Sequence, residues 1–262
     1  MWLYNRGFPM YNYHVCFTAA LEGHIPVLEW MKEHGRLEAD RVLYEMAALR
    51  DQLNVVKWLR EQGLHSMFWD AKGCNAAAKY QSQETFQWLI EEGCPWNAET
   101  GVCAVHSPGV GVLPFLKEKG YPHWTAEICI EAASKWNFEA LQWLREIGCP
   151  WNDLCYSAAI TGLKDRQQLL NERNIPWSKL VERGRLEFAP DADIVMMKWL
   201  REHGCPITAE TSAKVAETGR LEALKWLRES GCSWDSRTMA AAKKNNDDEM
   251  LQWLSENGCP SS

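Results

Sequence analysis

The chain contains the sequence motif Phe138-Glu-Ala-Leu-Gln-Trp-Leu-Arg-Glu-Ile-Gly-Cys-Pro-Trp151 and a close copy of it, Leu221-Glu-Ala-Leu-Lys-Trp-Leu-Arg-Glu-Ser-Gly-Cys-Ser-Trp234. The aromatic residue that precedes Leu or Met in this motif, called the anchor below, recurs every 26 to 30 residues along the sequence. The anchors are Trp2, Trp30, Trp58, Trp88, Phe115, Trp143, Trp199, Trp226 and Trp253, with Leu169 filling the one gap. Spacing this regular identifies an array of short repeats.

Each repeat is predicted to form two helices. In the second helix Leu221, Leu224 and Leu227 lie at helical spacing, and the following Gly231 suits the left-handed backbone of a helix C-cap. The first helix carries a pair of small residues, such as Ala132-Ala133, which lets a neighbouring helix approach closely. Capping residues stand where first helices should begin: Asn97, Thr125, Asn152, Ser178, Thr208 and Asp235. The sequence lacks the period-two alternation that is typical of strands.

One pair of helices cannot bury enough apolar surface alone, so the repeats must stack into an α-solenoid. We therefore expect an all-α fold with a single array over residues 1–262, about ten units long. The first unit should be partial, because Met1-Trp2-Leu3 begins in the middle of a second helix. That start predicts either a longer array upstream or a first turn that frays.

A degenerate unit is expected near residues 178–198. Gly184-Arg185 stands where the small pair should be, and Pro190 disfavours helix at the residue before it. The preceding anchor is Leu169, which buries less area than tryptophan. These features predict a seam of low stability between residues 178 and 193.

The 15 tryptophans fall largely into two series. Those at anchor positions, such as Trp143 and Trp226, are expected to be buried between helix pairs. The second series precedes the helix caps and consists of Trp96, Trp124, Trp151, Trp177 and Trp234. It is interpreted either as hydrophobic staples or as an exposed aromatic ladder for a ligand, and Trp151 should stabilise the fold less than an anchor does.

Charge and hydropathy narrow the function classes. The formal net charge is −7 and there is no run of Lys and Arg, which argues against a nucleic-acid-binding face. No apolar stretch reaches the roughly 18 residues of a membrane span, and the N-terminus lacks the pattern of a signal peptide. The sequence therefore predicts an intracellular protein, cytoplasmic or nuclear, with neither nucleic acid nor membrane as a partner.

The ten cysteines repeat in phase with the fold. Five follow a helix-ending glycine (Cys94, Cys149, Cys205, Cys232, Cys259) and five lie in first helices (Cys16, Cys74, Cys103, Cys129, Cys155). Packed helices lie about 8–10 Å apart, so equivalent cysteines of adjacent repeats should exceed the ~7 Å Cα separation that a disulfide allows. Metal-binding spacings such as Cys-x-x-Cys are absent from the sequence. We expect small, buried, reduced thiols, and a melting temperature that neither reductant nor chelator changes.

Signals for catalysis are weak. His24, His34 and His203 occupy turn or helix-end positions, where structural roles suffice. The glycine-rich stretch Pro108-Gly-Val-Gly-Val-Leu-Pro114 lacks the Lys-Ser/Thr of a phosphate-binding loop and is interpreted as a shortened repeat. The sequence thus predicts no catalytic residues, no metal and no cofactor, and hence a protein that is not an enzyme.

The segment Cys16-Phe-Thr-Ala-Ala-Leu-Glu-Gly-His-Ile-Pro-Val-Leu-Glu-Trp-Met-Lys-Glu-His-Gly35 resembles the ankyrin repeat, with Gly23-His24 at the Gly-His turn of that family. The resemblance covers essentially the whole chain. The repeat is shorter than the family's ~33 residues, which implies that the projecting fingers are reduced to tight loops. The repeat motif Trp-Leu-Arg-Glu-x-Gly-Cys-Pro-Trp is also similar to the repeats of ankyrin-like arrays in giant DNA viruses, algae and oomycetes.

The resemblance implies that the chain is a monomer that binds another protein or peptide through the concave face of its first helices. Carried over by position, the contact residues are Glu22, Arg50, Lys79, Tyr80, Lys135, Trp136 and Glu217. Trp136 replaces the turn glycine and is expected to be partly exposed. Two alternatives remain: a substrate-recruiting arm of a larger ubiquitin-ligase-type or host-modulating protein, and an enzyme whose site is grafted onto the solenoid.

Overall fold

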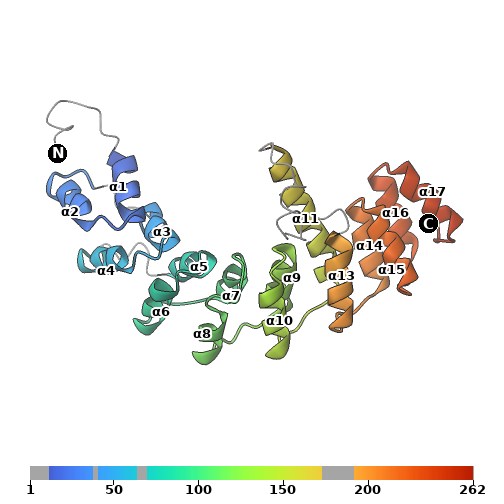
Figure 1. Cartoon of the computed structure of the whole chain (residues 1–262), viewed down its shortest axis with the longest axis horizontal. Helices are drawn as coiled ribbons and strands as arrows, with labels where there is room; N and C mark the ends of the chain where they lie inside the picture. Colours follow the sequence, from blue (N-terminus) through green and yellow to red (C-terminus); the bar gives the residue numbers. More distant parts are fainter. Residues whose placement is uncertain (1–11, 38–40, 64–69, 173–191, 262) are drawn as a thin grey trace. The chain divides into compact units, whose positions relative to one another are not determined.

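The computed structural model describes residues 12–37, 41–63, 70–172 and 192–261, and in these ranges the regular elements are α-helices (Figure 1). The chain divides into two compact units, Met1–Trp124 and Thr125–Ser262. Each unit is a stack of helix pairs, so the predicted all-α repeat architecture is confirmed. The expected frayed start and the expected seam fall on residues 1–11 and 173–191, which lie outside the described residues.

In unit 1 the helices alternate between two rows (Figure 1). The first helices are α1 (Asn12–Leu21), α3 (Arg41–Leu49), α5 (Ala71–Lys79) and α7 (Ala98–Ala104), and each contacts the next. The second helices are α2 (Ile25–Glu33), α4 (Leu53–Glu61), α6 (Gln83–Glu91) and α8 (Leu113–Glu118). Because each first helix also contacts its own second helix, the apolar core lies between the rows.

Unit 2 repeats the arrangement. Its first helices are α9 (Ala126–Ser134), α11 (Leu154–Glu172), α14 (Ala209–Glu217) and α16 (Ser236–Lys244), again in contact in that order. Its second helices are α10 (Phe138–Glu146), α13 (Ala192–Glu202), α15 (Leu221–Glu229) and α17 (Asp248–Glu256).

The helix ends follow the sequence signals. Asn97 and Thr208 form capping boxes with Thr100 and Thr211, and Asp235 accepts from the backbone N–H of Arg237 at 2.9 Å. Beyond the second helices Gly148 and Gly231 have φ of 78° and 82°. The next N–H then reaches back across the turn, for example from Cys232 to the Leu227 carbonyl at 2.9 Å. The predicted cap at Ser178 lies outside the described residues.

The core consists of the small pairs and of the residue after each anchor. The alanines at positions 20, 47, 48, 77, 78, 132 and 133 are fully buried, as are Met31, Leu89, Leu144, Leu200, Leu227 and Leu254. The anchors themselves behave differently. Trp58 is 5% exposed, but Trp143 and Trp226 are only half-buried. The expectation that those two are buried between helix pairs was wrong. Successive residues on a helix point about 100° apart, so when the leucine after each tryptophan faces the core, the tryptophan itself lies at the edge of the core.

The loop tryptophans, by contrast, are covered by cations. The Arg145 guanidinium lies 4.1 Å from the Trp151 ring, and Arg228 lies 4.2 Å from Trp234. The edge of Trp234 in turn meets Trp253 at 5.6 Å. The loop tryptophans are thus half-buried between one second helix and the next anchor, rather than standing free as a ladder. Trp177 of the same series lies outside the described residues.

Six of the described repeats are closed by a side chain just after the helix-ending glycine. The thiol of Cys94 donates to the carbonyl oxygen of Asp70, the N-cap residue 24 positions earlier, at 3.5 Å. The same contact recurs from Cys149, Cys205, Cys232 and Cys259, with sulfur–oxygen distances of 3.2 to 3.6 Å. In the shortened repeat the Tyr121 hydroxyl takes this role and donates to the Asn97 carbonyl at 3.0 Å. The loop cysteines therefore have a polar function besides filling space.

Neighbouring repeats in unit 1 are joined at the turn between first and second helices. Asp51, in the left-handed region with φ of 52°, accepts from the backbone N–H groups of Glu84 and Thr85 at 3.2 and 2.9 Å. Gln81, at the same position one repeat later, donates to the carbonyls of Ser107 and Pro108 at 3.0 and 2.7 Å. In the glycine-rich stretch, the Pro108 carbonyl is therefore already hydrogen-bonded to Gln81. The stretch connects the short helices α7 and α8, as expected of a shortened repeat.

One repeat differs from its prediction. The sequence pattern places a turn after the small pair of α11 and a separate second helix around Leu169. The structure instead continues α11 to Glu172, and Gly162 is helical. The Cys205 thiol then donates to the Asn152 carbonyl 53 residues earlier, instead of the usual 24. Helices α11 and α13 thus form one repeat with about one repeat length inserted between them.

Trp58 offers a test of this core. Replacing it by Ala should cost about 3–5 kcal/mol of unfolding free energy in urea melts, whereas Trp226→Ala should cost clearly less, because that ring is half-exposed. Trp58→Phe is the control. The buried indole N–H of Trp58 has no hydrogen-bond partner in the described part of the chain, so this change should be mild. Equal losses from the two Ala variants would contradict the assignment of the core.

Candidate partner-binding site

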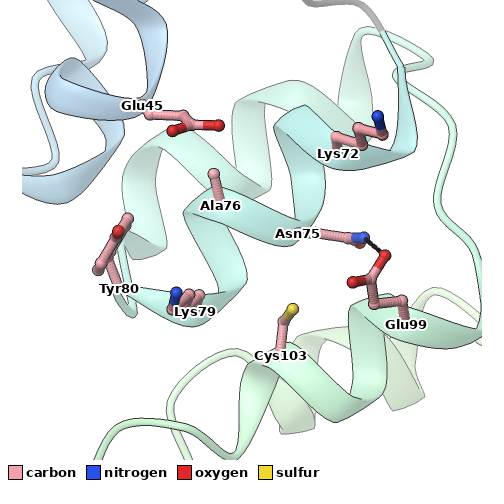
Figure 2. Close-up of a pocket in the computed structure, with 8 residues that line it drawn as sticks. All are labelled: Glu45, Lys72, Asn75, Ala76, Lys79, Tyr80, Glu99 and Cys103. Atoms are coloured by element: carbon pink, nitrogen blue, oxygen red, sulfur yellow. Dashed lines mark hydrogen bonds between the residues drawn. The ribbon is translucent and has the colours of Figure 1, made fainter. Parts of the chain in front are cut away.

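A groove of about 250 Å³ opens on the first-helix row of unit 1 (Figure 2). Its lining comes from three consecutive first helices: Glu45 from α3, then Lys72, Asn75, Ala76 and Lys79 from α5 with the adjoining Tyr80, and Glu99 and Cys103 from α7. The stacking of α3, α5 and α7 creates the groove, because small residues such as Ala76 face it from the middle helix. A chain segment that lies across these helices can therefore reach three repeats at once.

The wall of the groove is fixed by a buried polar network. The Asn75 side chain is 6% exposed, and its amide donates to a Glu99 carboxylate oxygen at 2.8 Å (Figure 2). The Thr100 hydroxyl donates to the Asn75 side-chain oxygen at 2.6 Å and accepts from the Asn97 backbone N–H at 3.0 Å. One network thus ties the middle of α5 to the capped start of α7, which orients Glu99 before any ligand arrives.

The groove carries charges of both signs. Lys72 and Lys79 lie seven residues apart on α5 and so share a face of that helix, and both are exposed. The Lys79 ammonium lies 5.6 Å from the centre of the Tyr80 ring. Glu45 and Glu99 supply the carboxylates. This arrangement of ammonium, carboxylate, amide and phenol groups around a small apolar patch suits a polar chain with side chains of mixed character, rather than a purely apolar ligand.

The predicted contact residues fall into three groups. Lys79 and Tyr80 line the groove. Glu22 and Arg50 form an exposed ion pair of 3.9 Å on the same row of unit 1. In unit 2 Lys135 pairs with Glu131 at 3.2 Å, and Glu217 pairs with Lys214 at 3.2 Å.

Trp136 does not have the partial exposure that the sequence suggested. Its side chain is 7% exposed, and its indole N–H donates to the Ala159 carbonyl of the next first helix at 2.8 Å. Its φ of 57° places it at the turn, as expected for a residue that replaces glycine. The ring is buried because the turn points it at the neighbouring repeat, so Trp136 joins repeats instead of offering a contact surface.

Sequence reasoning missed Glu45, Lys72, Asn75 and Glu99. Lys72 and Glu99 hold the same place, the second residue of a first helix, and Asn75 lies two residues before the small pair Ala77-Ala78. Comparing such positions across repeats could have found them, because residues at one repeat position line up on one face of a stack. The Asn75–Glu99 bond could not be predicted this way, since it depends on the distance between two helices.

Among the described residues, no three His, Cys, Asp or Glu side chains are grouped so that they could hold a metal ion. Within residues 12–37, 41–63, 70–172 and 192–261, no helix is both long and apolar enough to cross a membrane.

Comparisons with known proteins support the architecture only. No protein-family model matches the chain, and no curated protein sequence is similar to it. One solved structure that matches is the crystal structure of the pentatricopeptide repeat protein PPR10 from maize, with 13% identity and a TM-score of 0.26. The match covers 100% of this chain and 51% of that protein, so the chain spans about half its length. The likeness is one of fold class, an array of helical repeats.

The fold class corrects the expectation about nucleic acid. Helical repeats of the pentatricopeptide kind read RNA, one base per repeat. The exclusion of nucleic acid on the basis of net charge was therefore wrong for this class of fold. Protein and RNA are both partner classes that a helical repeat array commonly serves.

The Asn75 network can be tested by mutation. Asn75→Ala removes the partner of both the Thr100 hydroxyl and Glu99, and it should cost about 1–3 kcal/mol in a urea melt. Glu99→Gln keeps an acceptor for the Asn75 amide and should cost less than half as much. If Glu99→Gln lost as much stability as Asn75→Ala, the negative charge of Glu99, and not its hydrogen bond with Asn75, would be what fixes the groove wall.

Proposed function

We propose that the chain is an ankyrin-like scaffold that binds an extended segment of another protein across the first-helix row, with the groove of α3, α5 and α7 at the centre of the contact. The observation that carries the proposal is the groove itself, because two residues named from the family resemblance, Lys79 and Tyr80, line it. Three repeats contribute side chains to one surface, which is how repeat scaffolds build affinity from modest contacts.

The charge pattern favours a protein segment over RNA. A nucleic-acid strand carries a phosphate on every nucleotide, and the carboxylates of Glu45 and Glu99 would repel it along the same path as the lysines attract it. A peptide can match both signs with alternating acidic and basic side chains. Tyr80, half-buried beside Lys79, offers the amphipathic ring that is common in protein interfaces.

The outer contacts extend the same row. Glu22 follows α1 and Arg50 follows α3, so both lie toward the N-terminal end of the groove, where a bound segment would continue. They can exchange their mutual ion pair for pairs with the ligand. Lys135 and Glu217 hold the corresponding positions in unit 2 and are assigned to the same function there. A substrate-recruiting arm would use this surface in the same way.

Site-specific photo-crosslinking tests the proposal. The crosslinker p-benzoylphenylalanine, placed at Tyr80, should yield adducts in native-cell lysate that ribonuclease leaves intact and in which mass spectrometry finds peptides of a second protein. The matched control carries it at Gln87, an exposed position of α6 in the second-helix row, and should yield few. The double variant Lys72→Glu/Lys79→Glu should reduce the Tyr80 adduct at least tenfold.

Three outcomes would count against the proposal. Ribonuclease-sensitive adducts at Tyr80 would identify RNA as the ligand. Equal yields of adduct at Tyr80 and Gln87 would show that the partner contacts the first-helix and second-helix rows without preference. Adducts that survive Lys72→Glu/Lys79→Glu at full yield would mean that the groove cations do not contribute.

A further inference from the structure

The two cysteine series meet inside single repeats. Cys74, in the first turns of α5, and Cys94, in the loop after α6, are both buried. The Cys74 sulfur lies 3.9 Å from the Cys94 carbonyl oxygen, and the Cys94 thiol donates to the carbonyl of Asp70, the N-cap residue of α5. The spacing argument from the sequence compared equivalent cysteines in adjacent repeats and so did not consider this pairing within one repeat.

The pairing occurs three times. Cys129 and Cys149 occupy the same two positions in the repeat of α9 and α10, where the Cys149 thiol donates to the Thr125 carbonyl at 3.5 Å. In the repeat of α11 and α13, Cys155 and Cys205 are both buried, and the Cys205 thiol donates to the Asn152 carbonyl at 3.2 Å. A fourth repeat supplies a natural reference, because Ser212 stands where Cys74 and Cys129 do, and its hydroxyl oxygen lies 3.1 Å from the Cys232 sulfur. At this position the two side chains therefore point at each other and touch.

We propose that Cys74/Cys94, Cys129/Cys149 and Cys155/Cys205 are three modification sites at which a low-molecular-weight disulfide oxidises each thiol pair to a disulfide within its repeat. The inference rests on the thiol geometry and is independent of the proposed function. All six thiols are buried, so reaction requires local opening, and the loop cysteine lies next to helix ends, where opening is easiest.

The reaction balances with oxidised glutathione as the co-reactant. One protein thiol loses its proton and attacks a glutathione sulfur, which releases one glutathione thiolate and leaves a mixed disulfide. The second thiol loses its proton and attacks the protein sulfur of that mixed disulfide, releasing the second glutathione. Two protein thiols are oxidised by two electrons, one glutathione disulfide is reduced to two thiols, and both protons end on the released glutathione.

The environment of the second pair favours the first step. The Cys129 thiol donates a hydrogen bond to Cys149, which lowers the pKa of Cys149, and the nearby Arg145 guanidinium lowers it further. The same guanidinium donates to the Cys149 carbonyl at 3.1 Å, so it is held beside the sulfur-bearing residue. Cys149 is therefore the attacking thiol of its pair.

Oxidation would tie the first turn of a first helix to the loop that closes its repeat. In the first pair the cross-linked residues are 20 positions apart. Closing a loop of that size restricts the unfolded chain, so oxidation should raise the melting temperature by about 5–10 °C. The modified helix α5 also carries Asn75, so the bond would stiffen one wall of the groove.

Disulfide mapping tests the proposal on the full-length protein. The chain is equilibrated with oxidised glutathione, free thiols are alkylated, and peptides from trypsin plus Asp-N, which cuts between Cys149 and Cys155 at Asp153, are analysed by mass spectrometry. We expect cross-links 74–94, 129–149 and 155–205, with Cys232 still alkylated. The variant Ser212→Cys should gain a fourth cross-link, 212–232, under the same conditions.

The controls separate geometry from general oxidation. Cys94→Ser should abolish the first cross-link and leave Cys74 alkylated, with the other two unchanged. Thiols that stay reduced in excess oxidised glutathione, cross-links between different repeats, or a failure of Ser212→Cys to pair with Cys232 would each overturn the proposal.

Discussion

Close approach of neighbouring first helices is the constraint on which the rest of the structure depends. Most alanines of the small pairs in the first helices are fully buried, as at positions 47, 48, 132 and 133. The extreme case is Gly162 in α11, where an added Cβ would lie 1.9 Å from the Ser134 carbonyl oxygen of α9. Helices that approach this closely stack in register, and their N-caps, turns and closing thiols then recur at fixed positions.

That register produces the surface on which the functional argument rests. Because α3, α5 and α7 are successive neighbours in one row, residues at equivalent positions form the groove, and the Asn75–Glu99 bond fixes its wall. The same register brings a first-helix cysteine to the loop cysteine of its own repeat, as in Cys74, whose sulfur lies 3.9 Å from the Cys94 carbonyl oxygen. One packing rule thus accounts for both the binding surface and the thiol pairs.

The sequence predicted the helix pairs, their caps and the row that carries Lys79 and Tyr80, since these depend on local signals that repeat. It failed where the neighbouring repeat decides the outcome. Gly162 holds a turn position but stays helical against Ser134, whereas Trp136 adopts the left-handed turn and donates to the Ala159 carbonyl. Trp143 is half-exposed because only the residue after it faces the first-helix row. Such outcomes depend on distances between helices that no single repeat encodes.

The variant Gly162→Ala tests the close approach most directly, because the two possible explanations predict opposite signs. In a helix without a near neighbour, this change should stabilise the protein by about 0.5–1 kcal/mol. Since the new methyl group would meet a backbone carbonyl that cannot move aside, we expect a loss of about 1–3 kcal/mol in the urea melt. A gain in stability would show that α9 and α11 do not pack this closely and would contradict the account.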